Sequence, residues 1–366
     1  MTATKTMLPR PRRPGALPTA LLCAAALFTL RCSSGSPMGG GGGSGGTGGT
    51  GGTGGAPAPG AVIGWAGVDG DGVSTTTGGD GGMTVTAATP EELRAFTTSA
   101  EKLTIQIATS MAIGLLDVLS NKTLLGMGPD VVLSGGIRIR PLSTSDPVVS
   151  NVIVRNIKLD AATSPQADGG DGFHIERAHH VWIDHCEVWD AYDGNMDITH
   201  GSNWITVSWT KFRYSDTPAA ADHRYSNLIG HSENTGDTDR GRLKVTFHHD
   251  WWAEHIEQRM PRIRFGQVHV FNNYFNATGN LAAIAAGTEA SAVVENNYFD
   301  NVKDPHFFHE GSTTAQIAAT GNEYIGISAT TKRDVGQGPA FVPPYPTTLD
   351  PATSIPDLVR QGAGPL

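Results

Sequence analysis

Short stretches of alternating apolar and polar residues recur along the chain past residue 148. Most of them end in a polar residue followed by an aromatic or aliphatic one, in the segments SNVIVRNIKL, HHVWIDHCEVW, SNWITVSWTKF, GRLKVTFHHDWW, GQVHVFNNYF, SAVVENNYF and AQIAATGNEYI. Alternation with a period of two residues is typical of β-strands and not of helices. The pattern therefore predicts a chain built mainly of short strands.

The strands return at a regular interval. About 23 to 25 residues separate equivalent apolar positions, from Val181 to Ile205, Val245 to Val268, Val268 to Val293 and Val293 to Ile317. Strands at this interval cannot pair through tight hairpins, whereas stacked coils can pair them in parallel register. We predict an all-β fold, a single-stranded right-handed parallel β-helix (a solenoid) with inserted loops. A β-sandwich with long connections is the alternative.

Asparagines fall at equivalent places in the later repeats. In a stack of coils, such side chains can hydrogen-bond to the matching residue of the next coil. We expect a ladder of this kind from Asn272, Asn273, Asn296, Asn297 and Asn322.

The N-terminal part has the composition of an export signal followed by a tether. Basic residues precede an apolar run at 16–30, which is too short for a comfortable membrane span. Cys32 follows this run, so residues 1–32 are expected to be an export signal or a lipoprotein signal with Cys32 as a lipid anchor to the membrane. Residues 33–60 are almost entirely Gly, Ser, Thr and Pro, which is typical of a flexible tether. We expect a protein that is secreted or tethered to the outside of a bacterial cell, with residues 61–366 as the β-helix domain.

Charge and cysteine content narrow the possible functions and the possible sources of stability. The net charge of −9 argues against nucleic-acid binding, which depends on a basic surface. Of the three cysteines, only Cys186 lies in the expected folded domain, so no disulfide is expected there. We expect a monomer stabilised by its core and by backbone pairing.

Several long motifs, in order, resemble the pectate lyases of polysaccharide lyase family one. The resemblance is carried by GFHIERAHHVWIDHCEVWDAYDGNMDI, ITVSWTKF, NLIGHSEN, LKVTFHHDWW and QRMPRIRFGQVHVFNNYF, and it extends over roughly residues 61–366. It implies the parallel β-helix already predicted. It also implies cleavage of polygalacturonate (pectate) by β-elimination, usually with Ca²⁺, giving 4,5-unsaturated oligogalacturonides.

Three aspartates match the calcium-binding positions of that family: Asp171, Asp193 and Asp197. Calcium takes six to eight oxygen ligands, so clustered carboxylates suit it. In an extended chain Asp193 and Asp197 would lie about 13 Å apart, so the chain must bend between them. Asp168 is a weaker candidate, and Asp184 is expected to be structural.

The resemblance also assigns roles to arginines in QRMPRIRFG. Arg259 matches the proposed Brønsted base, and Arg264 matches a residue that holds the substrate. Arg262, between them, is interpreted as a surface charge. Because a free arginine side chain has a pKa above about 12, a base role implies activity at alkaline pH.

One position departs from the family pattern HxKxxLIG. Tyr225 stands where the family commonly has a lysine that binds the substrate carboxylate. Arg224 could supply the charge, but adjacent residues of a strand point to opposite faces. We therefore treat Arg224 and Tyr225 as candidate substrate-binding residues, and the departure leaves the preferred uronan open.

Three other functions remain as alternatives. A pectin lyase would act on methyl-esterified polymer without calcium, and a hydrolase would need two carboxylates about the scissile bond. A carbohydrate-binding β-helix without activity would suit the tether but would not need Arg259 as a base.

Overall fold

Parallel strands build the part of the chain that the computed structural model describes, residues 62–366. This part contains 25 strands, and the pairings between them are parallel. The predicted export signal at 1–32, with Cys32, and the predicted tether at 33–60 lie outside the described residues.

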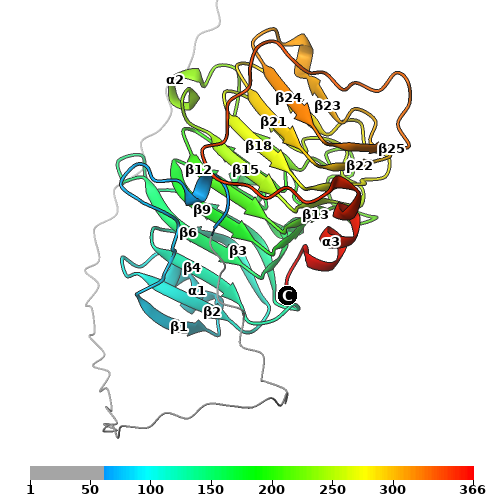
Figure 1. Ribbon diagram of the computed structural model, residues 1–366. Helices are drawn as coiled ribbons and strands as arrows, with labels where there is room; N and C mark the ends of the chain where they lie inside the picture. Colours follow the sequence, from blue (N-terminus) through cyan, green and yellow to red (C-terminus); the bar gives the residue numbers. More distant parts are fainter. Residues whose placement is uncertain (1–61) are drawn as a thin grey trace, which may run out of the picture. The chain divides into compact units, whose positions relative to one another are not determined.

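From β6 onward the strands follow one another in sets of three, and every third strand stacks on the same face. One face is a ten-stranded sheet of β1 (Met83–Ala87), β2 (Leu103–Ile107), β4 (Lys122–Gly126), β6 (Val149–Arg155), β9 (Ala178–Asp184), β12 (Asn203–Ser208), β15 (Lys244–His248), β18 (Gln267–Phe271), β21 (Ser291–Glu295) and β24 (Gln316–Thr320). Figure 1 shows several of these strands stacked in order. The backbone is a parallel β-helix, as predicted.

The other two faces are joined by one bent strand, β5 (Val132–Ile139). Its first half pairs with β7, its second half pairs with β8, and β3 (Met111–Val118) lies beside it. Gly135, at the bend, has φ 139°, a conformation that strongly favours glycine. One face continues through β7 (Lys158–Asp160), β10 (Glu187–Trp189), β13 (Lys211–Arg213), β16 (Trp251–Trp252), β19 (Tyr274–Phe275), β22 (Tyr298–Asp300) and β25 (Glu323–Ile325).

The remaining face carries the candidate site and is called the site face below. It consists of the second half of β5, β8 (Phe173–Glu176), β11 (Met196–Thr199), β14 (Asn227–Ile229), β17 (Arg262–Ile263), β20 (Ile284–Ala286) and β23 (His306–Phe308). Loops precede most of these strands, so residues of several coils can meet at one edge of the face.

Helices are few and short in the described part of the chain. They are α1 (Pro90–Thr97), α2 (Gly236–Asp239), α3 (Ile355–Gly362) and the 3₁₀ turns Trp65–Gly67, Ala161–Thr163, Gln166–Asp168, His309–Gly311 and Ala352–Ser354. Among the described residues, no helix is long and apolar enough to cross a membrane.

The register of the ten-stranded sheet agrees with the predicted repeat except at β21. Val181 pairs with Ile205, and Val245 pairs with Val268, as expected. Val268, however, pairs with Ala292, so the prediction of Val293 was wrong by one residue. Both Ala292 and Val293 are apolar and alternation alone could not choose between them. Ala292 is the one whose side chain is fully buried in the core.

The asparagine ladder forms from three of the five predicted residues. Asn273 donates to Asn297 Oδ1 (2.9 Å), and Asn297 donates to Asn322 Oδ1 (2.9 Å). Asn272 and Asn296 have positive φ and donate instead to the backbone carbonyl of Asp350 (2.9 Å each). These two residues therefore fasten the C-terminal segment to the coils.

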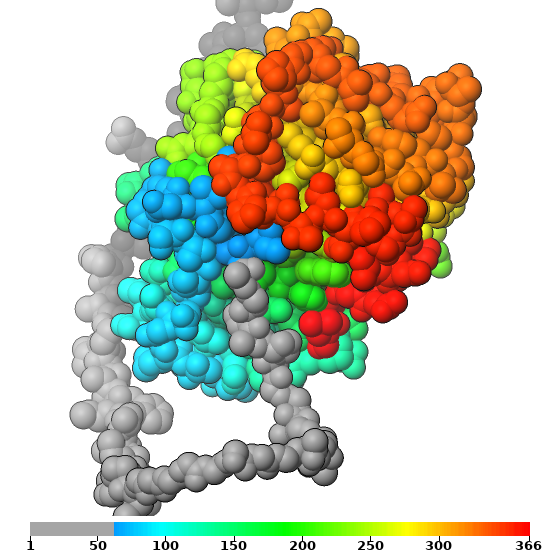
Figure 2. All heavy atoms as spheres, in the orientation of Figure 1, coloured from blue at the N-terminus to red at the C-terminus, as the bar shows by residue number. Residues whose placement is uncertain are grey.

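Terminal segments cover the ten-stranded sheet. The Trp65 backbone N–H donates to Thr246 Oγ1 (3.0 Å), and the Tyr345 hydroxyl lies 2.7 Å from the same oxygen. Figure 2 shows the first part of the described chain (blue) and its C-terminal part (red) lying over this side of the molecule. Cys186 is buried and free, as expected.

Candidate active site

A row of outward side chains crosses the site face in register. Core residues such as Ile175, Ile198 and Ile263 are fully buried and alternate with it, so the row points away from the core. From strand to strand, the row consists of Arg138, His174, Asp197, Leu228, Arg262, Ala285 and Phe307. We call it the outward row.

The three predicted aspartates meet beside this row. Asp171 lies two residues before β8, Asp193 lies in the loop before β11, and Asp197 lies on β11. One oxygen from each carboxylate lies within 4.8 Å of the other two. The chain therefore bends between Asp193 and Asp197, as the sequence requires. Two oxygens bound to one Ca²⁺ at 2.3–2.6 Å lie at most about 5 Å apart, so this spacing suits a shared ion.

The acidic cluster has oxygens left without partners. Asp171 Oδ1 and Asp197 Oδ1 are buried, and neither has a hydrogen-bond partner in residues 62–366. A Cβ built on Gly194 would lie 3.3 Å from Asp197 Oδ1 and 3.8 Å from Asp171 Oδ1, so the glycine keeps the space between them open. The donor set and the open space both fit a divalent cation with a preference for oxygen.

The electrostatics of the acidic cluster also favour a bound cation. Burial raises the pKa of Asp197 well above its usual value, and the negative charge of Asp171 raises this pKa further. Burial likewise raises the pKa of Asp171. Two buried carboxylates this close are costly to ionise together, and a bound cation would remove that cost.

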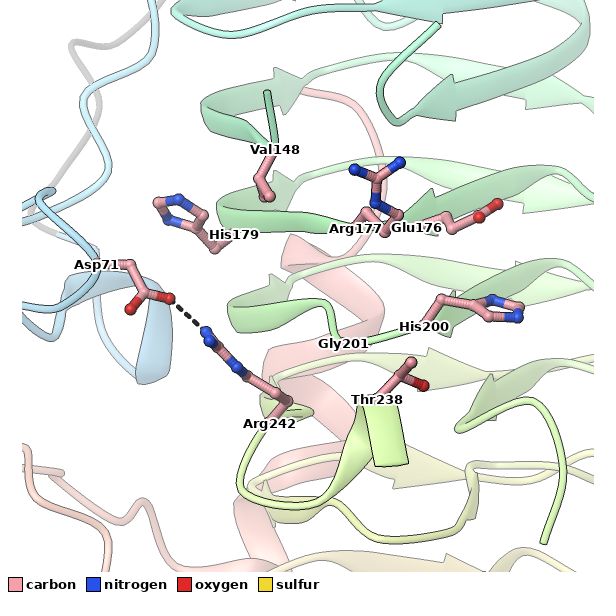
Figure 3. Close-up of a pocket in the computed structure, with 9 residues that line it drawn as sticks. All are labelled: Asp71, Val148, Glu176, Arg177, His179, His200, Gly201, Thr238 and Arg242. Atoms are coloured by element: carbon pink, nitrogen blue, oxygen red, sulfur yellow. Dashed lines mark hydrogen bonds and ion pairs between the residues drawn. The ribbon is translucent and has the colours of Figure 1, made fainter. Parts of the chain in front are cut away.

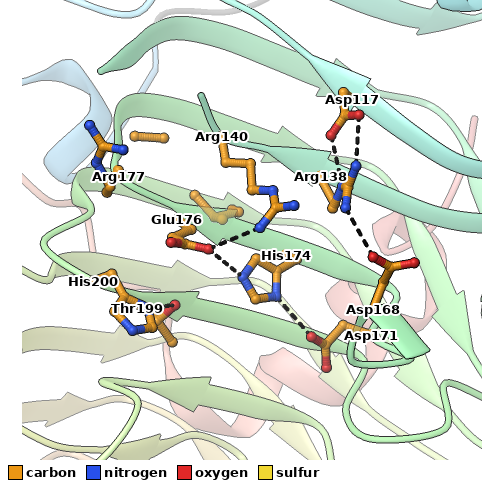
Figure 4. Close-up of polar contacts among 12 residues, drawn as sticks. Asp117, Arg138, Arg140, Asp168, Asp171, His174, Glu176, Arg177, Thr199 and His200 are labelled. Atoms are coloured by element: carbon orange, nitrogen blue, oxygen red, sulfur yellow. Dashed lines mark hydrogen bonds and ion pairs between the residues drawn. The ribbon is translucent and has the colours of Figure 1, made fainter. Parts of the chain in front are cut away.

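His174 holds the second oxygen of Asp171. Its Nδ1 lies 2.9 Å from Asp171 Oδ2, and its Nε2 lies 3.2 Å from Glu176 Oε2, which also faces Arg140 (Figure 4). Burial alone would lower the pKa of His174, but the hydrogen bonds to the two carboxylates outweigh it and raise the pKa to about 9. The hydrogen bond between His174 and Glu176 lowers the pKa of Glu176 to about 2. His174 thus turns Asp171 so that Oδ1 faces the cluster.

His174 is not among the predicted site residues, although the sequence contains a signal for it. In the coil register, Phe173-His174-Ile175 pairs with Met196-Asp197-Ile198. Aligning FHI with MDI in the two repeats would have placed His174 next to Asp197.

Arg259 lies next to the acidic cluster. Its positive charge lowers the pKa of both Asp171 and Asp197, opposing the effect of burial. Its guanidinium lies over the ring of Tyr225, 4.4 Å from the ring centroid. Arg259 Nη1 is buried without a hydrogen-bond partner in the described part of the chain. Arg259 and Tyr225 therefore stand together at the cluster.

The other candidate arginines are already paired. Arg224 donates to Glu257 Oε1 (2.7 Å). Arg264 donates to Glu233 Oε1 (2.6 Å) and, through Nη1, to the carbonyl of Gly230 (3.0 Å). Their substrate-binding roles stay predictions.

Two other aspartates lie apart from the acidic cluster. Asp168 lies 3.5 Å from Arg138 Nη1 and faces this arginine (Figure 4). Asp184 is buried in the ten-stranded sheet, where it accepts from Ser208 Oγ (2.6 Å) and pairs with Arg155 (2.9 Å). Its contacts are those of a structural residue.

A pocket of about 500 Å³ opens at the far end of the His174 contacts. Glu176 and His200 line one side, and the Asp71–Arg242 ion pair closes another (Figure 3). Glu176 therefore faces both this pocket and the network that holds Asp171.

Comparison with known proteins gives a consistent result. The sequence profile described as pectate lyase matches residues 16–325. The pectate trisaccharide-lyase of Thermotoga maritima is 33% identical over 323 residues, covering 79% of this chain and 84% of that protein. The pectate lyase plyB of Emericella nidulans is 33% identical over 276 residues, covering 73% of this chain and 78% of that protein.

Solved structures agree. The pectate lyase Bsp165PelA from Bacillus sp. N165, solved in complex with trigalacturonate, superimposes with a TM-score of 0.67 at 27% identity. The match covers 83% of this chain and 98% of that one. The fold and the comparisons together define a polysaccharide lyase on a parallel β-helix. The chain belongs to the pectate lyase family.

Proposed function

We propose that this protein cleaves polygalacturonate by calcium-dependent β-elimination and releases 4,5-unsaturated oligogalacturonides. The observation that carries the proposal is the acidic cluster with its two unpartnered buried oxygens, beside the unpartnered Nη1 of Arg259. The relatives named for pectate cleavage and the structure bound to trigalacturonate support the substrate.

Asp171, Asp193 and Asp197 would hold the ion. A bound Ca²⁺ supplies a Lewis acid that neutralises the substrate carboxylate, which makes the adjacent C5 proton more acidic. His174 keeps Asp171 oriented for this role, and Gly194 leaves the space free.

Arg259 is proposed as the base. Its neutral guanidine accepts the C5 proton, the C5–H electron pair forms the C4=C5 double bond, and the bond from C4 to the glycosidic oxygen breaks. The leaving oxygen keeps its electron pair and gains a proton from solvent. Because a guanidinium gives up its proton only at alkaline pH in water, we expect the rate to increase with pH on the alkaline side.

The reaction class can be tested by ultraviolet absorbance with polygalacturonate at alkaline pH. Elimination leaves a conjugated uronate that absorbs, whereas hydrolysis does not. We expect absorbance to increase with calcium and to stop increasing when a chelator is added. An increase that a chelator does not affect would overturn the calcium dependence, and an increase with methyl-esterified pectin in place of polygalacturonate would favour a pectin lyase. Release of reducing ends without absorbance would indicate a hydrolase and overturn the proposal.

A further inference from the structure

Arg262 occupies a position from which it can reach a sugar next to the acidic cluster. It lies in the outward row on β17, paired in register with Leu228 on β14, and Leu228 in turn pairs with Asp197 on β11. Neighbouring strands are about 4.8 Å apart, so the backbones of Arg262 and Asp197 are separated by roughly 10 Å. A polymer that crosses these strands from the acidic cluster would pass over Arg262.

The guanidinium of Arg262 has no close partner. Its nearest carboxylates are those of Glu233 (3.7 Å) and Glu310 (3.8 Å), whereas a full hydrogen bond of this kind measures about 2.7–2.9 Å. Its Nε is buried and makes no hydrogen bond within residues 62–366. The side chain is 18% exposed, so it is shielded from water yet reachable from the surface.

Positive charge is concentrated around this side chain. Burial lowers the pKa of Arg262, and the charges of Arg264 and Arg259 lower it further. An anion bound at Arg262 would relieve this repulsion. The geometry thus provides a fork of N–H donors whose existing partners are too distant to satisfy it.

The position of Tyr225 adds a second observation. The family pattern has a lysine there, and in this chain the tyrosine ring stacks against Arg259. Arg224, its neighbour, is occupied by Glu257. The outward row also contains Arg138, but Arg138 is paired with Asp117 (2.7 Å). Arg262 is therefore the arginine of this row that, among the described residues, has no close carboxylate and could replace the missing lysine.

We propose that Arg262 binds the carboxylate of the galacturonate unit next to the one held at the acidic cluster, and so makes the enzyme prefer unesterified to methyl-esterified polymer. This inference rests on the proposed function. A methyl ester has no charge and cannot accept the charge-assisted hydrogen bonds that a carboxylate accepts.

A purely structural role for Arg262 predicts something different. Glu233 and Glu310 are 48% and 73% exposed, and ion pairs at such positions contribute little to stability. If Arg262 served only these pairs, its loss would affect all substrates alike or none.

The test compares kcat and KM of Arg262→Gln and wild type on polygalacturonate and on highly methyl-esterified pectin. Because charge-assisted hydrogen bonds are lost, we expect KM on polygalacturonate to increase about tenfold, with kcat nearly unchanged. KM on esterified pectin should stay the same. Arg262→Lys, which keeps the charge, should recover most of the affinity.

Arg240→Gln is the matched control. Arg240 is an exposed arginine paired with Glu289 (2.8 Å), away from the outward row, and its loss should leave both substrates unaffected. A second variant, Glu310→Gln, removes an exposed carboxylate that competes for Arg262. It should lower KM on polygalacturonate about twofold, in line with a weak surface pair.

The outcomes separate this inference from the proposed function. An unchanged KM on polygalacturonate in Arg262→Gln, an equal loss on both substrates, or an increased KM in Glu310→Gln would overturn the inference. If wild type showed no calcium-dependent elimination, the proposed function would fail. The role of Arg262 would then be tested by binding alone, with calorimetry of oligogalacturonate binding to wild type and to Arg262→Gln. Weaker binding by Arg262→Gln would support the inference, and equal binding would overturn it.

Discussion

At the scale of residues, the site depends on how one carboxylate is turned. Asp171 has one oxygen held by His174 at 2.9 Å and the other free in the acidic cluster. Without His174, the Asp171 side chain could rotate and present either oxygen, or neither, to an ion. Groups that orient a metal ligand in this way commonly contribute 10- to 100-fold to metal affinity.

We therefore predict that His174→Ala raises the dissociation constant for calcium about tenfold or more, because losing the orientation of Asp171 outweighs losing the positive charge of His174, which by itself would favour a cation. Isothermal titration calorimetry measures this change without relying on activity. His255→Ala is the matched control, because His255 lies outside the cluster and pairs with exposed Asp216 (2.8 Å). An affinity for calcium that is the same in both variants would show that His174 does not position Asp171.

Much of the site at this scale could be predicted from sequence. The resemblance of the motifs around Asp171, Asp193 and Asp197 to those of the family was enough to predict that the three aspartates meet, and the structure brings one oxygen of each within 4.8 Å of the others. The pairing of Arg224 with Glu257 could not be predicted, because the partner lies in a loop of another coil. Contacts between loops depend on how each insertion folds, and the repeat does not determine that.

At the scale of elements, the asparagine ladder stabilises the later coils. Asn297 accepts from the backbone N–H and side chain of Asn273 and donates to the Val270 carbonyl and Asn322. Asn273 and Asn297 are both fully buried, so without the Asn297 side chain the Asn273 backbone N–H would lose its partner where water does not reach, whereas Asn322 Oδ1 would keep the Asn297 backbone N–H.

Asn297→Ala should lower the free energy of unfolding by about 2–4 kcal/mol, because several buried polar groups lose their partners. Urea denaturation followed by circular dichroism measures this change. Asn234→Ala, in an exposed turn, is expected to change stability by less than about 0.5 kcal/mol. Equal stability of the two variants would contradict a supporting role for the ladder.

Alternation and spacing were sufficient to predict the coil, but not the register of every strand. Between β18 and β21 the prediction was wrong by one residue, because Ala292 and Val293 are both apolar. Likewise, Asn272 and Asn296 were expected in the ladder, but they lie at left-handed turn positions and bind the C-terminal segment. The polar partner of such a residue comes from a segment more than fifty residues away, which a local pattern cannot reveal.

At the scale of the whole molecule, buried histidines couple stability to pH. His248 is buried, with Nδ1 3.0 Å from His249 Nδ1 and its ring stacked on Phe271. Burial lowers the pKa of His248 well below its usual value, and the nearby histidines His249, His269 and His185 lower it further. As pH is lowered, the His248 ring therefore stays neutral in the folded state at pH values at which it is already protonated in the unfolded state.

The sign of the pH effect follows from this difference. Below about pH 6.5, His248 is protonated in the unfolded state but stays neutral in the folded state. The free energy of unfolding therefore falls as pH falls. The contribution of His248 should be about 1.4 kcal/mol between pH 7.5 and 5.5. We measure the unfolding free energy with saturating calcium at pH 7.5 and pH 5.5. Between these two values, the decrease for His248→Gln should be about 1.4 kcal/mol smaller than the decrease for wild type. An identical pH dependence in the two proteins would contradict a neutral buried His248.

The central claim is that the acidic cluster binds the ion and Arg259 performs the proton transfer, as two separable functions. The most direct measurement is calcium binding by calorimetry beside ultraviolet-detected elimination, in wild type and Arg259→Ala. Because the charge of Arg259 opposes a cation at Asp171 and Asp197, we predict that the variant binds calcium at least as tightly as wild type. We also predict that it forms at least about 100-fold less unsaturated product, as expected when a general base is lost. Elimination at the wild-type rate, or loss of calcium binding together with activity, would contradict the account.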